Sequence, residues 1–215
     1  MAAHTDVRRG APPERLGGPL LVAAMVAWGA LVLGGTLWTW KYKSTPSPAG
    51  AAPARWPAES TLPRRVGQSL LLMLAHPRCA CTRASLTELS ALLGEVGSRV
   101  DAAVVFVQPE GTSDDWIEGD LWHAAQAIPG LKVVVDRGGR EAQRFGALAS
   151  GTVLLYDADG QLQFSGGITA ARGHVGDNLG RRRVVGLVKD GVADRPQSPV
   201  FGCDLLDQSE RGAKP

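Results

Sequence analysis

Two cysteines separated by one residue, Cys79 and Cys81, lie in the segment HPRCACT between an apolar run and a predicted helix. Free N–H groups and the helix dipole at such a helix start favour an anion, and a thiolate is one. Arg78 and Arg83 add positive charge to the segment. We therefore expect a lowered thiol pKa and a nucleophilic thiolate near neutral pH.

A disulfide between Cys79 and Cys81 would close a small, strained ring that is easier to reduce than a relaxed bridge. Such a bond suits thiol exchange better than a structural cross-link. The alternative interpretation is that both residues are small, semi-buried residues at a helix cap.

A third cysteine, Cys203, lies in the C-terminal segment SPVFGCDLL. The chain between the last predicted helix and Cys203 can extend about 40 Å, longer than the roughly 21 Å helix that it must run back along. Apolar neighbours could dock this tail on the domain: Val200, Phe201, Leu205 and Leu206. A free or intermolecular tail cysteine is the alternative.

The same residues also allow a metal hypothesis. His76, Cys79 and Cys81, with Cys203 or His174, form a soft nitrogen and sulfur set that suits copper(I) or zinc. A closed metal site needs three or four converging ligands, whereas thiol exchange needs only two thiols and a tuned pKa. We therefore rank a thiol-disulfide oxidoreductase first, a copper or zinc chaperone or sensor second, and a tethered binding module third.

Composition excludes other classes. The chain has 215 residues and a net charge of +2, from 23 Lys and Arg against 21 Asp and Glu. This charge is too weak to indicate a nucleic-acid partner. Three cysteines are also too few for a disulfide scaffold.

Residues 20–40 form an uncharged stretch of 21 residues. As a helix this stretch would be roughly 30 Å long, which spans a bilayer core. Aromatic residues and lysines gather at its C-terminal end, as at a membrane interface: Trp38, Trp40, Tyr42, Lys41 and Lys43. We predict a retained transmembrane anchor, although the basic residues on its two sides are too balanced to orient it. The predicted organisation is a short cytoplasmic N-terminus (1–19), the transmembrane helix (20–40), a Pro/Ala-rich linker (41–63), one domain (64–195) and a tail (196–215).

Strand and helix patterns alternate within the domain. Apolar runs predict strands at 69–75, 102–108, 131–136, 152–156 and 161–164, the last two forming a hairpin. Periodic apolar residues predict helices at 82–96, 114–128, 140–147 and 176–189, the last capped by Asp177 or Asn178. The resulting β-α-β-α-β-α-β-β-α order predicts an α/β domain with a central mixed sheet and helices on both faces.

The first strand, the Cys79 turn, the helix segment ASLTELSALL and the later segment FGALASGTVLLYDADGQLQFSGG resemble the thioredoxin-like superfamily. Within it, the segments resemble the membrane-anchored TlpA/ResA-like branch in particular, with its RedB-type proteins. The resemblance implies a thioredoxin-like fold and exchange with protein thiols and disulfides, with no cofactor beyond a redox-active disulfide. It further implies a bacterial inner-membrane location, with the domain facing the periplasm.

The motif departs from that family at two places. Matching the first helix puts Cys79 at the attacking position and Thr82 at the resolving one, so that Cys81 or Cys203 must resolve the mixed disulfide. The family's cis-proline position is taken by Gly151, after Ser150. The resemblance thus implies catalytic cysteines at 79, 81 and 203, with binding residues Arg78, Thr82, Ser150, Gly151 and His174.

Overall fold

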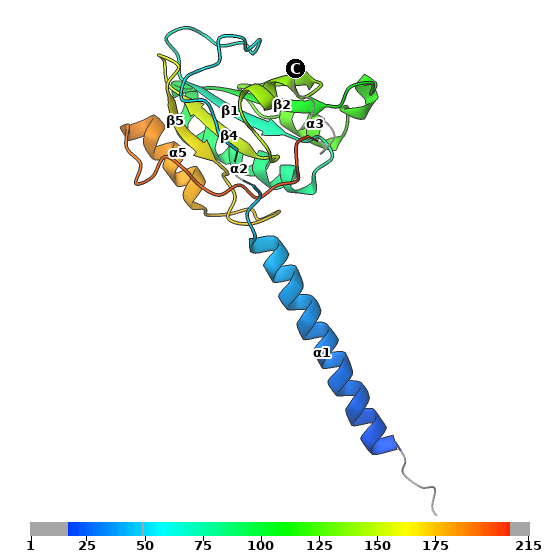
Figure 1. Ribbon diagram of the computed structural model, residues 1–215. Coiled ribbons are helices and arrows are strands. Elements are labelled where there is room, and N and C mark those ends of the chain that lie inside the picture. The colour runs from blue at the N-terminus through cyan, green and yellow to red at the C-terminus, as the bar shows by residue number, and fades with distance from the viewer. Residues whose placement is uncertain (1–16, 49, 207–215) are drawn as a thin grey trace, which may run out of the picture. The chain divides into compact units, whose positions relative to one another are not determined.

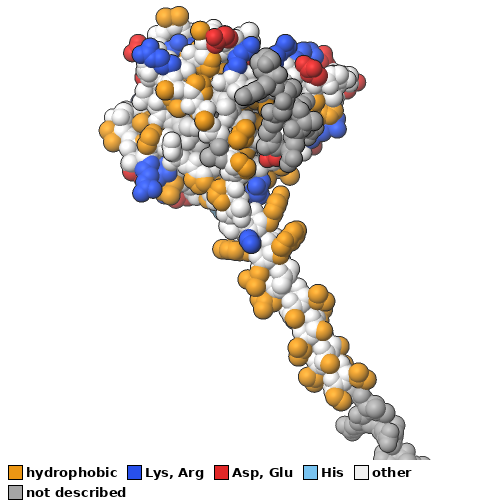
Figure 2. Space-filling view, viewed as in Figure 1, with side chains coloured by type: hydrophobic (Ala, Val, Ile, Leu, Met, Phe, Trp, Pro, Cys, Tyr) orange, Lys and Arg blue, Asp and Glu red, His pale blue; other side chains and the backbone are white. Residues whose placement is uncertain are grey.

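The structure is a computed structural model that describes residues 17–48 and 50–206. The chain divides into two compact units, residues 1–42 and 43–215. In the first unit, helix α1 (Gly17–Ser44) contains one segment that is long and apolar enough to cross a membrane, with a mean hydropathy of 2.1. Figure 2 shows apolar side chains along this helix. Residues 1–16, which carry most of the expected cytoplasmic N-terminus, lie outside the described residues.

The second unit is built on a five-stranded sheet (Figure 1). Its strands are β1 (Leu70–Ala75), β2 (Asp101–Gln108), β3 (Leu131–Arg137), β4 (Thr152–Tyr156) and β5 (Leu162–Gly166). The spatial order is β3-β2-β1-β4-β5, with β1, β2 and β3 parallel and with β4 antiparallel to both β1 and β5. This order is that of a thioredoxin-like fold and confirms the predicted mixed sheet.

Helices cover both faces of this sheet, as predicted. They are α2 (Ala80–Val96), α3 (Asp120–Gln126), α4 (Arg140–Arg144) and α5 (Leu179–Asp190). Successive strand residues point to opposite faces, so Leu71 and Met73 of β1 join the core beneath α2, α3 and α5, whereas Leu72 and Leu74 join the core beneath α4. All four of these side chains are fully buried, which explains why β1 reads as a continuous apolar run.

The single helix predicted over 114–128 is wrong. The segment forms a 3-10 turn (Asp114–Trp116), and α3 begins only at Asp120, after Gly119 in an extended conformation. Glycine is unfavourable inside a helix, and Asp120 in the first turn complements the helix dipole. The last helix also starts later than predicted, because Asn178 caps it: its Oδ1 accepts a hydrogen bond from the Arg181 N–H at 2.8 Å.

The segment after α1 is not the free linker that the composition indicated. The Trp56 N–H donates to the Gly160 carbonyl at 2.8 Å, and the Trp56 ring packs edge-on against Phe145 and Tyr156, with centroids 4.9 and 5.3 Å apart. Leu62 is buried in the same core. The compact unit therefore begins near residue 43 rather than 64, because these apolar side chains complete the α4 face of the sheet.

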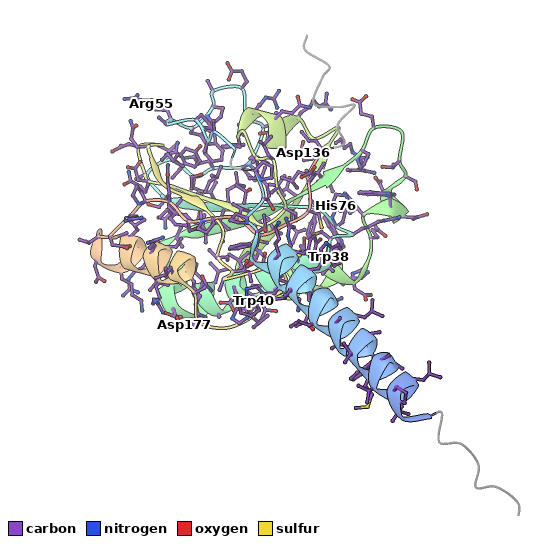
Figure 3. All side chains as sticks on the ribbon, turned by 60° about the horizontal axis from the view of Figure 1, so that its bottom comes forward. Trp38, Trp40, Arg55, His76, Asp136 and Asp177 are labelled. Carbon is purple, nitrogen blue, oxygen red and sulfur yellow. The ribbon has the colours of Figure 1, made fainter. Side chains whose placement is uncertain are left out.

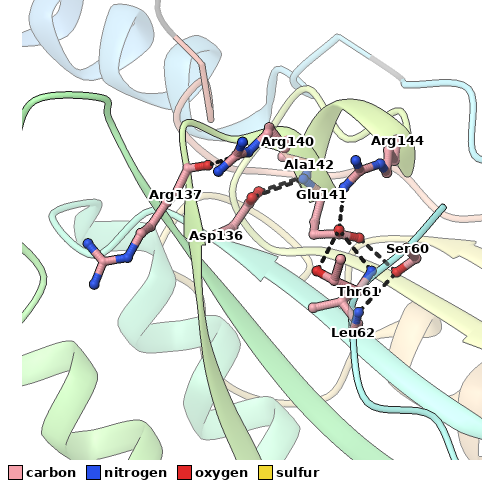
Figure 4. A network of polar contacts seen from close by, with 9 residues as sticks. All are labelled: Ser60, Thr61, Leu62, Asp136, Arg137, Arg140, Glu141, Ala142 and Arg144. Atoms are coloured by element: carbon pink, nitrogen blue, oxygen red, sulfur yellow. Dashed lines mark hydrogen bonds and ion pairs between the residues drawn. The ribbon is translucent and has the colours of Figure 1, made fainter.

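A buried carboxylate on α4 also binds the segment between α1 and β1 by hydrogen bonds (Figure 4). Glu141 accepts hydrogen bonds from the Ser60 hydroxyl at 2.7 Å, from the N–H and hydroxyl of Thr61 at 3.2 Å, and from Arg144 at 2.5 Å. Burial raises the pKa of Glu141, but these hydrogen bonds outweigh it and hold the pKa below its ordinary value. The ionised form is thus the one that the fold stabilises.

We expect Glu141→Gln to lower the free energy of unfolding at pH 7 by about 1.5–3 kcal/mol, because an amide NH2 would replace a charged acceptor. Stabilisation by a carboxylate of lowered pKa is fully present above its unfolded value, about 4.3, and is lost as pH falls through the folded value. The deficit should therefore shrink in acid. Urea unfolding of the full chain in detergent micelles would measure it, with the exposed Glu59→Gln as control. An equal effect of both variants would contradict the prediction.

Candidate functional site

The three cysteines converge where β1 ends and α2 begins. His76, labelled in Figure 3, follows β1, and Cys79 occupies the N-cap of α2 with extended backbone angles. Cys79 is buried, Cys81 is half-buried and Cys203 is exposed, and all three are free thiols. Their sulfur atoms lie within 4.8 Å of one another. The structure thus brings together the three cysteines that the sequence singled out.

Cys203 is held there by strand-like pairing of the tail with the segment before β4. The Ser150 N–H donates to the Cys203 carbonyl at 2.8 Å, and the Leu205 N–H donates to the Leu148 carbonyl at 3.0 Å. Ala149 and Asp204 form an antiparallel bridge between these bonds. Leu205 is also buried. This part of the tail is therefore docked on the domain.

The other side of the tail pairs with the segment that follows α1. The buried Ser47 donates its N–H to the Val200 carbonyl at 2.8 Å and its hydroxyl to the Gly202 carbonyl at 2.7 Å. The Gly202 N–H donates to the Ser47 Oγ at 3.0 Å. A Cβ atom on Gly202 would collide with the backbone of Ser150. Only glycine fits between these two segments without a shift.

Arg172 fixes the same junction by its side chain. Its guanidinium donates to the Gly202 carbonyl and, at 3.1 Å, to the Ser47 hydroxyl. It is also close enough to Cys81 and Cys203 to favour their thiolate forms. Arg172 is therefore the positive charge of this site.

The groups around the Cys79 sulfur favour its thiolate. Burial raises the pKa of Cys79, but the nearby thiol and N–H of Cys203 and the N–H groups of Cys81 and Thr82 lower the pKa overall. The lowered thiol pKa that we predicted at the helix start is thereby confirmed for Cys79. Cys79 is the sulfur of this cluster that ionises most easily.

The other two thiols behave in the opposite way. Partial burial of its thiol, together with the nearby Cys79 sulfur, raises the pKa of Cys203 to about 12 although the residue as a whole is exposed. Burial and the charge of Cys79 also raise the pKa of Cys81, against the opposing effects of Arg172 and the Gly173 N–H. The expectation of a lowered pKa was therefore wrong for Cys81. Of the three thiols, only Cys79 has a lowered pKa.

Thr82 and Ser150 connect the cysteine turn to the segment before β4. The Ser150 hydroxyl accepts from the His76 N–H at 2.9 Å and lies 2.8 Å from the Thr82 hydroxyl, which also bonds the His76 carbonyl. Gly151 donates its N–H to the Leu74 carbonyl at 2.8 Å and has φ +86°, a conformation that favours glycine. These predicted binding residues thus hold the two halves of the site in register.

Neither arginine of the cysteine turn is among the groups that lower the pKa of Cys79. The Arg78 guanidinium lies over the Trp116 ring, 4.8 Å from its centroid, and Arg83 pairs with Asp120 at 3.6 Å. His174 is exposed and does not join the sulfur cluster. The sequence predicts that the arginines supply the positive charge, whereas in the structure Cys203 and the first turn of α2 lower the pKa of Cys79.

The sequence analysis did not identify three residues of this site: Ser47, Arg172 and Gly202. Ser47 and Arg172 are far from the cysteines along the chain, and nothing in their local sequence indicates that they meet the tail. Gly202 does carry a signal, since a glycine directly before a cysteine can mark a close backbone approach.

The strand order and the cysteine turn at the start of α2 define a thioredoxin-like domain with a three-thiol site. No protein-family model matches the chain, and no curated protein matches it. Solved structures do match.

A hypothetical protein of Sinorhizobium meliloti 1021 is 22% identical with a TM-score of 0.52, over 76% of this chain and 96% of that one. An uncharacterized conserved protein of Geobacillus kaustophilus is 14% identical with a TM-score of 0.54, over 76% and 90%. The pneumococcal exposed lipoprotein thioredoxin Etrx1 of Streptococcus pneumoniae is 21% identical with a TM-score of 0.41, over 58% and 85%. At these identities the likeness of the first two concerns the fold alone.

Proposed function

We propose that this protein is a membrane-anchored thiol-disulfide oxidoreductase that exchanges with protein thiols and disulfides. The observation that carries the proposal is the position of the Cys79 sulfur, which lies within 4.8 Å of two further thiols in surroundings that lower its pKa. A thiolate beside a thiol is what disulfide exchange requires. Helix α1 would anchor the domain outside the cytoplasm, facing the periplasm, where disulfides persist.

The pair that we assign to exchange is Cys79 and Cys203. The sequence left the resolving cysteine open between Cys81 and Cys203. The Cys203 thiol lies within 4.8 Å of the Cys79 sulfur and has the largest effect of those that lower the pKa of Cys79. Cys203 is also the exposed member of the cluster, whereas Cys79 is buried.

Exposure and pKa together define the exchange step. In the oxidised protein, a thiolate of the partner attacks the exposed Cys203 sulfur and forms a mixed disulfide, while the electron pair of the broken S–S bond goes to Cys79. Cys79 leaves readily because its thiolate is stabilised, and thiols of low pKa are better leaving groups. A second thiolate of the partner then attacks the partner's own sulfur in the mixed disulfide and releases Cys203, which takes up a proton. The partner dithiol is oxidised, and the Cys79–Cys203 disulfide is reduced.

The reverse direction uses the same atoms. The Cys203 sulfur loses its proton, attacks a disulfide of the partner and releases one partner thiolate, which leaves a mixed disulfide. The Cys79 thiolate then attacks the Cys203 sulfur and releases the second partner thiolate, so that the Cys79–Cys203 disulfide forms and the partner is reduced. Cys79 is thus the attacking thiolate of the internal step, and Cys203 is the sulfur that meets the partner.

The test is disulfide mapping in the full chain, purified in detergent micelles and equilibrated in glutathione buffers of graded potential. After alkylation of the free thiols, digestion and mass spectrometry identify the bonded pair. We expect a Cys79–Cys203 disulfide that is absent from Cys79→Ser and Cys203→Ser and retained in Cys81→Ser.

Two results would overturn parts of this proposal. If no intramolecular disulfide forms at any potential, the oxidoreductase function is wrong. If a Cys79–Cys81 disulfide forms instead and survives in Cys203→Ser, the exchange function stands but the assigned pair is wrong.

A further inference from the structure

The exchange just described uses two thiols and leaves Cys81 without a part in it. Cys81 nonetheless lies in the same cluster, with its sulfur within 4.8 Å of both others. We propose that Cys79, Cys81 and Cys203 bind one copper(I) ion through three sulfur atoms. This inference is independent of the oxidoreductase function, since it needs the third thiol and no disulfide.

The spacing of the sulfurs fits a three-coordinate ion. A metal ion bonded to three sulfurs at about 2.3 Å in one plane holds those sulfurs about 4 Å apart. The observed separations are all 4.8 Å or less, so small side-chain rotations would close the site. The backbones are already placed: Cys79 and Cys81 by the first turn of α2, and Cys203 by the pairing of the tail with Ser150.

The ligand set selects copper(I) over zinc. Thiolates are soft ligands that suit both ions, but structural zinc sites are almost always four-coordinate. Within residues 17–48 and 50–206, no histidine or carboxylate joins the three sulfurs. His76, which the sequence offered as a fourth ligand, accepts a hydrogen bond from the Arg78 N–H at its Nδ1, 3.1 Å away, and its ring packs edge-on against Trp116.

The surroundings of the cluster offset the charge of such a site. Binding releases to solvent the protons that the three sulfurs carry, and no electron is transferred. Three thiolates and one copper(I) ion carry a net charge of −2. The guanidinium of Arg172, which donates to the carbonyl of Gly202 next to Cys203, supplies positive charge beside the sulfurs.

Copper binding and disulfide formation compete for the same sulfurs. A Cys79–Cys203 disulfide removes two of the three ligands, so only the reduced protein binds the ion. A bound ion in turn ties Cys203, and with it the tail, to the start of α2. Reduction of the site would therefore be the step that permits metal loading.

The test is anaerobic titration of the reduced full chain, in detergent micelles, with copper(I) buffered by a chromogenic chelator. We expect one equivalent to bind and an X-ray absorption spectrum with three sulfur ligands. Cys81→Ser should weaken binding by about a hundredfold or more, because losing a ligand costs at least as much as losing an outer-shell contact. The same variant should keep its Cys79–Cys203 disulfide, which separates this proposal from the exchange function.

Controls define what would overturn the site. His174→Ala should leave the affinity unchanged, and a loss there would mean a histidine ligand. Unaltered binding by Cys81→Ser, a two-sulfur spectrum, or zinc binding as tight as copper(I) binding would each contradict a three-sulfur copper site.

Discussion

Replacing Cys79 by serine should abolish disulfide exchange, with a loss in rate of about a thousandfold or more. A serine hydroxyl remains protonated at neutral pH and is neither the nucleophile nor the leaving group that exchange requires. The two remaining thiols are poor substitutes, because burial raises the pKa of both Cys81 and Cys203 in the present site. Of the three thiols, only Cys79 has surroundings that lower its pKa overall.

The measurement is the rate at which the full chain, in micelles, oxidises a dithiol peptide under a fixed glutathione potential. Cys81→Ser provides the matched control, since it makes the same chemical change two residues further along the chain. This variant should retain most of the rate. If Cys79→Ser keeps more than about a tenth of the rate, or if Cys81→Ser loses as much, Cys79 is not the central sulfur.

Much of the fold could be predicted because its signals are local. The apolar run before the cysteines predicted β1, and the turn residues DADG between two apolar runs predicted the hairpin of β4 and β5. The prediction of one helix over 114–128 was wrong at Gly119, because this residue without a side chain interrupts an otherwise periodic apolar pattern. The prediction that residues 41–63 are a linker outside the domain was wrong for a different reason. Trp56 and Leu62 are isolated apolar residues in a Pro/Ala-rich segment, and only the assembled sheet provides a surface against which they pack.

The candidate site likewise has one part that the sequence could predict and one part that it could not. Cys79 could be identified because its chemistry depends on a helix start that the sequence shows. The position of Cys203 could not be fixed, since chain length established only that it could reach the site. Its place depends on bonds from Ser47, Arg172 and Ser150, three segments that meet only in the folded domain.

Replacing Gly202 by alanine should displace the tail and separate Cys203 from Cys79. The added methyl group would lie against the carbonyl of Ser150, whose N–H pairs with the Cys203 carbonyl. The tail must therefore shift, and a misplacement of about 1 Å lowers the probability of a reactive encounter about a hundredfold. We expect the equilibrium constant for the Cys79–Cys203 disulfide to fall by about that factor. The pKa of Cys79 should also rise, because the thiol and the N–H of Cys203 no longer lie close to its sulfur.

Gly119→Ala is the matched control, since the same methyl group there meets only an ordinary contact and the backbone does not require glycine. Glutathione titration of both variants gives the equilibrium constants, and thiolate absorbance against pH gives the ionisation midpoint. The midpoint should move upward in Gly202→Ala alone, because a group that loses donors to its charged form ionises at higher pH. An unchanged midpoint together with an unchanged disulfide would show that the close approach of Gly202 to Ser150 does not position Cys203.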